Sequence, residues 1–384
     1  MAVFGHSGSQ APQLIHSSVI MIAIVFLYFC KSTPDLTQKQ MPNSPIQQRI
    51  QSISQLGAFL TDALRPTGPA ALELTMILDQ AMAQNRWFTH ESMRQALSYW
   101  ADQLNPQSLG EWVGRYDELK ITCPKRVLLI LAGNIPLVGF HDVLCTYLSG
   151  HISVIKASQK DSVLLRYLLH QLTDIAPKSK SLFDWTTNTT TDFEFVIATG
   201  STNSSRYFDY YFKKYPHIIR RNRNSLAYLE QSERQEHLEL LCNDVFDYFG
   251  LGCRNVSHLL LQKGFDLNRL IEILNRCTEL LTHNKYMNNV DYHRSVFIMN
   301  GQNFKDAGTA LLVESQLISS PIGVIHYQWV DDEQEAAAYI RAQQNAIQCV
   351  VSSSDRHLKF GDTQKPRLGD YADQIDTLDF LLAL

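Results

Sequence analysis

The chain has 384 residues, of which 45% are hydrophobic and 19% are charged, and its formal net charge is −4. This length can form one large domain or two of ordinary size. The slight acidic excess gives no reason to expect a nucleic acid or an anionic membrane surface as a partner. The seven cysteines are scattered, with no C-x-x-C motif and no histidine pair at zinc-ligand spacing. This pattern favours reduced thiols in the cytoplasm over disulfides or a metal site.

The first 40 residues differ in composition from the rest of the chain. Residues 19–30 are an unbroken apolar run of twelve, whereas a membrane span needs about 20 residues. No Lys or Arg precedes Lys31, so the basic start of a signal peptide is missing. Met41 opens a segment that looks like an ordinary soluble N-terminus. Three interpretations stay open: a disordered or spurious extension over residues 1–40, a signal peptide, or an anchor over residues 14–30 that contacts a membrane.

Two amphipathic helical runs follow. Apolar residues recur at intervals of three and four over residues 46–104, and Gly68 with Pro69 separates the two runs. We expect these helices to cover one face of the domain that follows, and they show no motif for chemistry.

From residue 125 the sequence alternates between short apolar strands and amphipathic helices. This order is typical of a doubly wound α/β unit with a parallel sheet. The expected strands cover residues 126–132, 152–156 and 193–198, and the expected helices cover residues 137–148, 161–172 and 203–214. Ligands of such sheets bind beyond the carboxyl ends of the strands. Asn134, Lys156, Gly200 and Ser201 follow strand ends and should therefore line one crevice.

Two segments of this unit could meet phosphate groups. No G-x-G-x-x-G motif follows any strand, but residues 200–202 (Gly-Ser-Thr) stand at a helix start, where free amides suit a phosphate. An ordinary N-cap is the alternative. Residues 220–224 (Arg-Arg-Asn-Arg-Asn) are either a solvated charged turn or a contact for the phosphates of a nucleotide or of coenzyme A.

A strand over residues 225–229 precedes a predicted domain boundary near residue 232. The boundary separates N-terminal helices plus a nucleotide-binding α/β unit (residues 41–232) from a catalytic α/β domain (residues 233–384), with a cleft between them. In the second domain the expected strands cover residues 256–261, 295–299, 320–325 and 347–351, and the expected helices cover residues 236–248, 267–281 and 333–343.

One cysteine of the second domain stands in a turn that suits a nucleophile. Cys253 lies between Gly252 and Arg254, where a predicted helix gives way to a strand. Glycine allows close approach of a substrate to the backbone, and an adjacent cation can lower the pKa of a thiol. The alternative is a small buried hydrophobic residue, which is the usual state of a cysteine. Cys145 and Cys242, inside predicted helices, are interpreted in that second way.

Four segments in chain order resemble the aldehyde dehydrogenase superfamily. Residues 131–137 resemble the segment with the asparagine of the oxyanion hole, and residues 154–158 resemble the segment with the lysine that meets the cofactor ribose. Residues 198–202 resemble the Gly-Ser turn under the nucleotide diphosphate, and residues 249–255 resemble the segment with the nucleophilic cysteine. Within the superfamily, a further set of runs resembles the LuxC acyl-CoA reductase family over about residues 45–384: residues 133–136, 198–201, 220–225, 249–255 and 370–378.

This resemblance implies an aldehyde-dehydrogenase-like fold, with two doubly wound α/β domains, an interdomain active-site cleft and an N-terminal helical segment. It implies Cys253 as the nucleophile and Asn134 as a donor to the oxyanion. The cofactor-binding residues that it implies are Lys156, Gly200, Ser201 and Thr202.

Two departures from the superfamily pattern bear on the direction of the reaction. Aldehyde-oxidising members carry Glu-Leu-Gly-Gly, whose glutamate activates water, whereas no Gly-Gly pair accompanies Glu230 here. In the superfamily a glutamate four residues before a proline binds the nicotinamide ribose. Here that position, four residues before Pro321, is Leu317, and Glu314 is nearby in the sequence. Reduction of a thioester activates no water, so it tolerates the missing base.

The resemblance therefore implies a fatty acyl-CoA or acyl-thioester reductase that forms an aldehyde through an acyl-enzyme on Cys253 and hydride transfer from NADPH. NADPH rather than NADH is expected from the biosynthetic direction, with Lys156 or the arginines of residues 220–223 meeting the 2′-phosphate. The implied partners are acyl-CoA or an acyl-protein thioester, an acyl-transfer or synthetase partner subunit, and further copies of the chain in a homo-oligomer.

Two other functions stay open. The first is a cysteine-dependent acyltransferase or thioesterase without redox chemistry, in which Lys156 and the Gly-Ser turn would have no ligand. The second is a catalytically idle partner subunit, which leaves Cys253 and Asn134 without a purpose. His141, on the first helix of the α/β unit, is either a proton donor or a packing residue.

Overall fold

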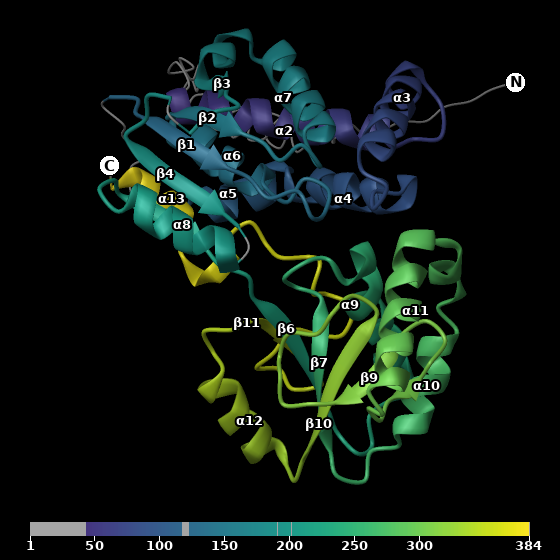
Figure 1. Cartoon of the computed structure of the whole chain (residues 1–384). Helices are drawn as coiled ribbons and strands as arrows, with labels where there is room; N and C mark the ends of the chain where they lie inside the picture. The colour runs from purple at the N-terminus through teal and green to yellow at the C-terminus, as the bar shows by residue number, and fades with distance from the viewer. Residues whose placement is uncertain (1–43, 117–122, 190, 201, 384) are drawn as a thin grey trace, which may run out of the picture. The chain divides into compact units, whose positions relative to one another are not determined.

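The computed structural model describes residues 44–116, 123–189, 191–200 and 202–383 (Figure 1). The chain divides after Pro45 into two units, and both sheets belong to the second, Ile46–Leu384. The predicted extension over residues 1–40, with its candidate anchor, lies outside the described residues. Among the described helices, none combines the length and the apolar character that a bilayer crossing needs.

The first predicted helical run is α2 (Pro45–Ala63). The second is interrupted between Gln84 and His90, so it forms α3 (Pro69–Gln84) and α4 (His90–Gln103), and α5 (Pro106–Val113) follows. Proline opens α3 and α5 at a position where the missing N–H costs no hydrogen bond. A capping box between Thr89 and Ser92 opens α4. Gly57 lets α2 lie against the end of α4, because a Cβ at this position would meet the Leu104 carbonyl oxygen at 2.7 Å.

The first sheet has the strand order β3-β2-β1-β4-β5, and all its strands are parallel. The strands are β1 (Arg126–Ile130), β2 (Ile152–Lys156), β3 (Phe183–Trp185), β4 (Phe195–Thr199) and β5 (His217–Arg220). The connecting helices are α6 (Phe140–Ser149), α7 (Val163–Ile175), the short η1 (Pro177–Leu182) and α8 (Thr202–Phe212). Along β1, Val127 and Leu129 face the core formed with α2–α7, whereas Leu128 and Ile130 face α8. The predicted alternation of strand and helix is confirmed, and β3 and β5 are additional.

The second sheet has the strand order β11-β6-β7-β10-β9-β8, parallel except for the β8–β9 pair. Its strands are β6 (Asn224–Leu229), β7 (Val256–Gln262), β8 (Lys305–Asp306), β9 (Leu311–Glu314), β10 (Val324–Val330) and β11 (Ile347–Val351). Its helices are α9 (Gln235–Phe246), η2 (Asp247–Gly250), α10 (Leu267–Asn275), η3 (Thr278–Thr282), α11 (Asn284–Met299) and α12 (Glu333–Ala342). Leu259 and Leu261 of β7 pack with α9, α10 and α11, and Leu260 packs on the α12 side (Figure 1).

One predicted strand is wrong. Residues 295–299 are the last part of helix α11, which begins after His283. His283 caps the helix, since its Nδ1 accepts a hydrogen bond from the Tyr286 amide at 3.2 Å. The helix buries Tyr286, Val290 and Phe297. A window of five apolar and β-branched residues cannot separate a helix from a strand, because the two differ only in the spacing of their buried positions.

Three further boundaries shift where the backbone turns. The helix predicted from residue 137 begins at Phe140, because Leu137 has a left-handed φ of 59°. The helix predicted over residues 267–281 ends at Asn275 and continues, after a break, as η3. The strand predicted from residue 320 begins at Val324, directly after Gly323, whose φ is +79°.

The chain changes sheets twice. It leaves the first sheet between β5 and β6, so the last strand of the predicted first domain, residues 224–229, pairs in the second sheet. After β11 it returns, because Leu368, Tyr371 and α13 (Thr377–Leu382) pack in the first core. A buried apolar strand has the same composition in either sheet, so the sequence does not predict which sheet β6 joins. A short apolar tail likewise does not indicate which core it packs against.

The arginines of residues 220–223 all have acidic partners. Arg220 is buried and pairs with Asp142 of α6, and its Nη2 donates to Thr377 Oγ1 at 2.7 Å. The remaining pairs are Arg221 with Asp209 at 2.9 Å and Arg223 with Asp373 at 3.2 Å. Arg220 is therefore neither the solvated turn nor the phosphate contact predicted from sequence, but an internal link from β5 to α6 and α13.

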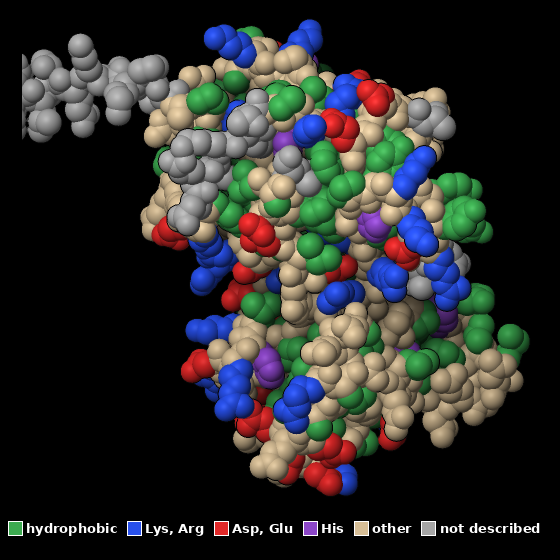
Figure 2. Space-filling model, turned by 90° about the vertical axis from the view of Figure 1, so that its left-hand side faces the viewer, with side chains coloured by type: hydrophobic (Ala, Val, Ile, Leu, Met, Phe, Trp, Pro, Cys, Tyr) green, Lys and Arg blue, Asp and Glu red, His purple; other side chains and the backbone are tan. Residues whose placement is uncertain are grey.

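Charges on the surface are mixed where they can be seen. On the face drawn in Figure 2, basic and acidic side chains are interspersed with scattered hydrophobic ones. This agrees with the small net charge of −4.

The buried ion pair predicts a large cost for removing one partner alone. Arg220→Met should lower the free energy of unfolding by about 3–5 kcal/mol, because it leaves the Asp142 carboxylate buried without a counter-charge. The double variant Arg220→Met with Asp142→Leu should recover most of this loss. Urea titrations followed by circular dichroism measure both. The control is Arg221→Met, whose exposed ion pair should contribute less than about 1 kcal/mol; equal losses in the two single variants would contradict the prediction.

Candidate active site

Cys253 lies in a loop whose backbone is strained just before it. The chain leaves α9 through Tyr248 and Phe249, which have left-handed φ values of 53° and 60°, and through Gly250 at 71°. Side chains other than glycine rarely adopt this region, and holding them there costs of order 1 kcal/mol or more each. The surrounding contacts must therefore hold the loop in place.

The side chain of Asn255 supplies those contacts. It is buried, and its Oδ1 accepts a hydrogen bond from the Gly252 amide at 2.8 Å. Its Nδ2 lies within hydrogen-bond distance of three carbonyl oxygens at the end of α9, those of Asp244 (3.2 Å), Val245 (3.3 Å) and Asp247 (2.8 Å). One amide thus joins the end of the helix to the residue before the cysteine.

The thiol of Cys253 is half-buried, and its environment differs from the prediction. Burial raises the pKa of Cys253 to about 11, although the neighbouring Arg254 acts in the opposite direction. Arg254 Nε donates a hydrogen bond to the Thr363 carbonyl oxygen at 2.5 Å. The predicted lowering of the thiol pKa is therefore wrong, because desolvation outweighs the attraction of one partly buried cation.

Asn134 reaches the nucleophile loop from the first sheet. It follows β1, and its Nδ2 donates a hydrogen bond to the Leu251 carbonyl oxygen at 2.7 Å. A side-chain amide has two N–H groups, so this bond leaves the second one for a ligand. The two residues that were predicted to share the chemistry, Asn134 and Cys253, are thus brought together from different sheets.

A buried carboxylate shapes the turn that presents Asn134. Asp161 Oδ2 accepts a hydrogen bond from the Leu137 amide at 2.7 Å. Burial raises the pKa of Asp161 well above its usual range. Gly133 allows the close approach, since a Cβ there would lie 2.6 Å from Ser158 Cβ and 3.2 Å from Asp161 Cβ.

Two of the residues predicted to hold a cofactor, Lys156 and Gly200, lie at the carboxyl ends of strands in the first sheet. Lys156 ends β2 opposite Ile130 of β1, and Ala198 of β4 lies opposite the same residue on the other side. Gly200 follows β4, and a Cβ there would meet Ser204 Cβ and Phe208 Cε2 at 2.9 Å, so α8 itself requires the glycine. Of the other two predicted residues, Ser201 lies outside the described residues, and Thr202 begins α8 with a side chain that is not described.

An apolar cavity of about 170 Å³ opens at Cys253. Aromatic side chains of α4 form part of its wall, among them Tyr99 and Trp100. Two amide atoms in the wall, Gln348 Oε1 and Gln364 Nε2, are buried and make no hydrogen bond to another described residue. The sequence gives only a weak signal for Tyr99 and Trp100 as cavity residues, because an apolar helix position that faces a cavity has the same spacing as one that faces the core.

His141 also borders this cavity, but both of its nitrogens are engaged. Nε2 donates to the Leu368 carbonyl oxygen at 2.8 Å, and Nδ1 faces Cys145 Sγ at 3.8 Å. The ring stacks on Trp112 with 5.4 Å between centroids. Burial lowers the pKa of His141. These contacts agree with a packing residue rather than a proton donor.

The glutamates considered from sequence lie elsewhere. In the parallel β6–β7 pair Ser225 lies opposite Val256, so Glu230 is five residues further along the strand, about 16 Å from the level of the loop at 3.3 Å per residue. Its Oε1 accepts a hydrogen bond from Ser353 Oγ at 3.2 Å. Glu314 is exposed at the end of β9. Among the described residues, no cluster of three or more His, Cys, Asp or Glu side chains could hold a metal.

A family model described as "Acyl-CoA reductase (LuxC)" matches residues 69–285, more than half of the chain. A search of curated proteins finds no match.

Solved structures with a similar fold are aldehyde dehydrogenases. Aldehyde dehydrogenase 21 from Physcomitrella patens, in complex with the reaction product succinate, has 13% identity and a TM-score of 0.64, over 89% of this chain and 84% of that one. An indole-3-acetaldehyde dehydrogenase in complex with NAD+ has 16% identity and a TM-score of 0.60, over 85% and 75%. An NAD-dependent benzaldehyde dehydrogenase from Corynebacterium glutamicum has 13% identity and a TM-score of 0.59, over 83% and 79%. The predicted aldehyde-dehydrogenase-like fold is confirmed.

The raised thiol pKa predicts how Cys253 reacts with pH. Only the thiolate is alkylated, so the rate of iodoacetamide labelling at Cys253 should rise about tenfold per pH unit from about pH 7 to pH 10 without levelling off. Peptide mass mapping measures the labelling at this position, and Cys253→Ser identifies its peptide. A plateau below about pH 8 would show instead a thiolate that is stabilised in the free protein.

The contacts of Asn255 predict that it holds the loop. Asn255→Ala should lower the free energy of unfolding by about 2–4 kcal/mol, because it leaves buried backbone groups without partners. Asn255→Asp keeps an acceptor for Gly252 but turns a carboxylate toward three carbonyl oxygens, so it should be at least as destabilising. Denaturant unfolding measures the effect. Asn243→Ala, at an exposed position of the same helix, is the control, and an equally small effect of all three changes would overturn this role.

Proposed function

The chain belongs to the acyl-CoA reductase (LuxC) family, and we propose that it reduces an acyl thioester to an aldehyde through a covalent acyl-enzyme on Cys253. The observation that carries the proposal is the hydrogen bond from Asn134 Nδ2 to the Leu251 carbonyl oxygen. It brings an amide donor of the first sheet to the loop of the second sheet that carries Cys253, and Cys253 lines an apolar cavity.

The first step is an exchange of thioesters. Cys253 Sγ forms a bond to the acyl carbon, the bond from that carbon to the sulfur of the donor breaks, and the thiol proton of Cys253 ends on the released thiol. Because the pKa of the free thiol is about 11, few molecules carry the thiolate before substrate arrives. The nearby Arg254 favours the anion as it forms.

Negative charge develops on the acyl oxygen during this exchange and needs donors. The second N–H of Asn134 and the backbone amide of Cys253 are the first two candidates. Gln364 Nε2 is a third, because it is an unpartnered donor in the cavity wall and lies 3.6 Å from the position of a Cβ on Gly252. The apolar lining contributed by Tyr99 and Trp100 suits the hydrocarbon part of an acyl group.

We propose a nicotinamide dinucleotide as the cofactor. Lys156 fits it, since this half-buried residue stands at the carboxyl end of β2, where dinucleotides bind in such sheets. Two of the structural relatives are described as binding or depending on NAD. When bound there, the dinucleotide supplies the hydride that converts the acyl group to an aldehyde. Cys253 then leaves the carbon as the aldehyde forms.

NADPH is the proposed form of the cofactor. The biosynthetic direction supports it, and Lys156 is the basic residue that remains to meet a 2′-phosphate. The arginines of residues 220–223 no longer support it, because each is paired with a carboxylate.

The site supports reduction over hydrolysis of the acyl-enzyme. Hydrolysis needs a base within hydrogen-bond reach of a water at the thioester. Glu230 lies at the opposite end of β6 and is bonded to Ser353, and His141 has both nitrogens engaged. A thioesterase would have no use for Lys156 at the neighbouring edge. We further propose that the acyl donor is acyl-CoA or an acyl group carried by a partner subunit. We also propose that the chain assembles into a homo-oligomer.

The acyl-enzyme predicts a mass change that can be followed. Incubation with a fatty acyl-CoA and no cofactor should add one acyl group on the peptide that contains Cys253, stable to denaturation and labile to hydroxylamine. NADPH should discharge it as aldehyde faster than NADH does. Cys253→Ala should abolish labelling and turnover, whereas NADPH binding, measured by fluorescence, should persist. Aldehyde formation by Cys253→Ala at the wild-type rate would refute the covalent route.

The oxyanion donors predict slower acylation when they are removed. Asn134→Ala should slow acylation by about 10²–10³-fold, the usual loss for one such donor. Gln364→Leu removes only the amide and should also slow acylation, with NADPH binding unchanged. Gln334→Leu, at an exposed position of α12 and outside this cavity, is the control. An acylation rate that is unchanged in Asn134→Ala would remove this residue from the mechanism.

A further inference from the structure

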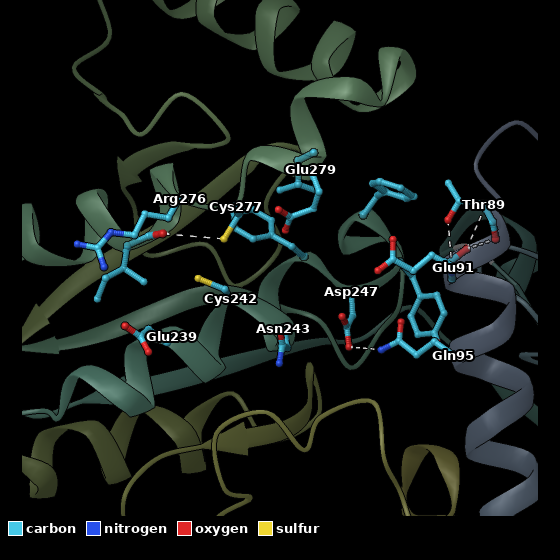
Figure 3. A pocket seen from close by; sticks show the side chains of 16 residues that line it. Thr89, Glu91, Gln95, Glu239, Cys242, Asn243, Asp247, Arg276, Cys277 and Glu279 are labelled. Atoms are coloured by element: carbon cyan, nitrogen blue, oxygen red, sulfur yellow. Dashed lines mark hydrogen bonds between the residues drawn. The ribbon is translucent and has the colours of Figure 1, made fainter.

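A second cavity, of about 470 Å³, lies on the other side of Tyr248 from the Cys253 cavity, and Tyr248 belongs to both walls. Its lining comes from α4, from α9 and from the α10–η3 segment (Figure 3). Two cysteines stand in the same wall, Cys242 of α9 and Cys277 between α10 and η3. Neither takes part in the proposed reaction.

The two sulfurs are neighbours. In Figure 3 the sulfur atoms of Cys242 and Cys277 lie near each other, and each thiol shifts the pKa of the other. Each thiol also contacts a carbonyl oxygen one turn back, Leu238 at 3.7 Å and Ile273 at 3.9 Å. Both cysteines are free thiols, with exposed fractions of 8% and 9%, so each keeps a small accessible surface toward the cavity.

The two thiols are unequal. The neighbouring Cys242 lowers the pKa of Cys277, against the opposing effects of burial and of Glu279. The contact with Cys277 raises the pKa of Cys242, and burial together with Glu279 and Glu239 acts in the same direction. Cys277 is therefore the thiol that carries the negative charge first.

We propose that Cys242 and Cys277 are a redox-active dithiol that closes to a disulfide by exchange with a small disulfide such as oxidised glutathione. Cys277 attacks one sulfur of the small disulfide and forms a mixed disulfide, and the first glutathione leaves as a thiolate. Cys242 then attacks Cys277 Sγ, the mixed disulfide breaks, and the second glutathione leaves. Two protein thiols are oxidised, one small disulfide is reduced to two thiols, and the two protons pass to the leaving groups.

The local backbone suits this closure. The two sulfurs must approach to about 2.05 Å. Cys277 lies outside a regular helix, at the break after α10, with φ −76° and ψ 56°. A residue at such a break can adjust its backbone more easily than one inside a helix, so Cys277 can move toward Cys242 while α9 keeps its hydrogen bonds.

Other thiols of the chain provide contrast. Cys145 is buried beside His141 and has a pKa raised well above its usual range by burial, so it should not react. Cys123 is exposed, so it should form a mixed disulfide and report that the reagent is active. Cys349 contacts Ser225 Oγ at 2.9 Å, and burial raises its pKa.

The test uses the full chain and oxidised glutathione, followed by blocking of remaining thiols, digestion and peptide mass mapping. The expected result is a peptide pair linked through Cys242 and Cys277, lighter by two hydrogens than the sum of its parts and separated by dithiothreitol. Cys145→Ser, the matched control, should form the same link. A wild-type chain that carries glutathione on Cys123 but no Cys242–Cys277 link would overturn the proposal.

Two variants separate the roles of the thiols. In Cys242→Ser, Cys277 should keep a stable glutathionyl group, because the resolving thiol is gone. In Cys277→Ser, Cys242 should stay unmodified over the same time. Faster modification of Cys242 than of Cys277 in these two variants would reverse the assignment and overturn the proposed order of attack. Neither measurement depends on reductase activity, so failure of the proposed function would not affect it.

Discussion

The amide of Asn255 is the contact on which the nucleophile loop depends. Two successive residues with positive φ, Tyr248 and Phe249, turn the chain sharply after α9, and such a turn persists only when its surroundings hold it. Asn255 bonds to carbonyl oxygens at the end of α9 and to the Gly252 amide, which places the cysteine between a helix end and the start of β7. Leu251, inside the same turn, offers the carbonyl oxygen that Asn134 reaches from the first sheet. The buried side chain of Asn255 thus holds the strained turn after α9 and fixes the Cys253 loop at the start of β7.

The C-terminal segment closes the same site from the other side. Tyr371 accepts a hydrogen bond from Trp112 Nε1 at 2.8 Å, and Asp376 accepts one from Tyr116 at 2.8 Å. These bonds anchor the C-terminal segment to α5 and the residues just after it. The same segment supplies Gln364 to the cavity wall. The buried pair of Arg220 with Asp142 fixes the end of this segment through Thr377. The cavity is therefore built from residues that are far apart in the chain.

The sequence predicts best what local patterns determine. The alternation of strand and helix places Asn134 and Lys156 at strand ends, and the glycine-flanked turn singles out Cys253, because these features depend on near neighbours in the chain. Prediction fails where distant residues decide. The thiol pKa rises because packing buries Cys253, which no adjacent residue reveals. Arg220 has a partner in Asp142, 78 positions away. Tyr99 and Gln364 enter the cavity wall from segments whose apolar or polar pattern looks the same whether they face a core, a cavity or solvent.

The raised pKa of the Cys253 thiol has a consequence for the proposed exchange of thioesters. A thiolate of higher pKa is intrinsically the better nucleophile but the poorer leaving group. Once acylated, Cys253 should therefore be displaced more slowly by an incoming thiol than a sulfur of ordinary pKa would be. In the proposed reaction that asymmetry would keep the acyl group on the enzyme until a hydride donor reaches it, and Glu230, far from the loop, would not activate water there. Burial of the thiol, which at first looks unfavourable for a nucleophile, would then protect the intermediate that the proposed reduction requires.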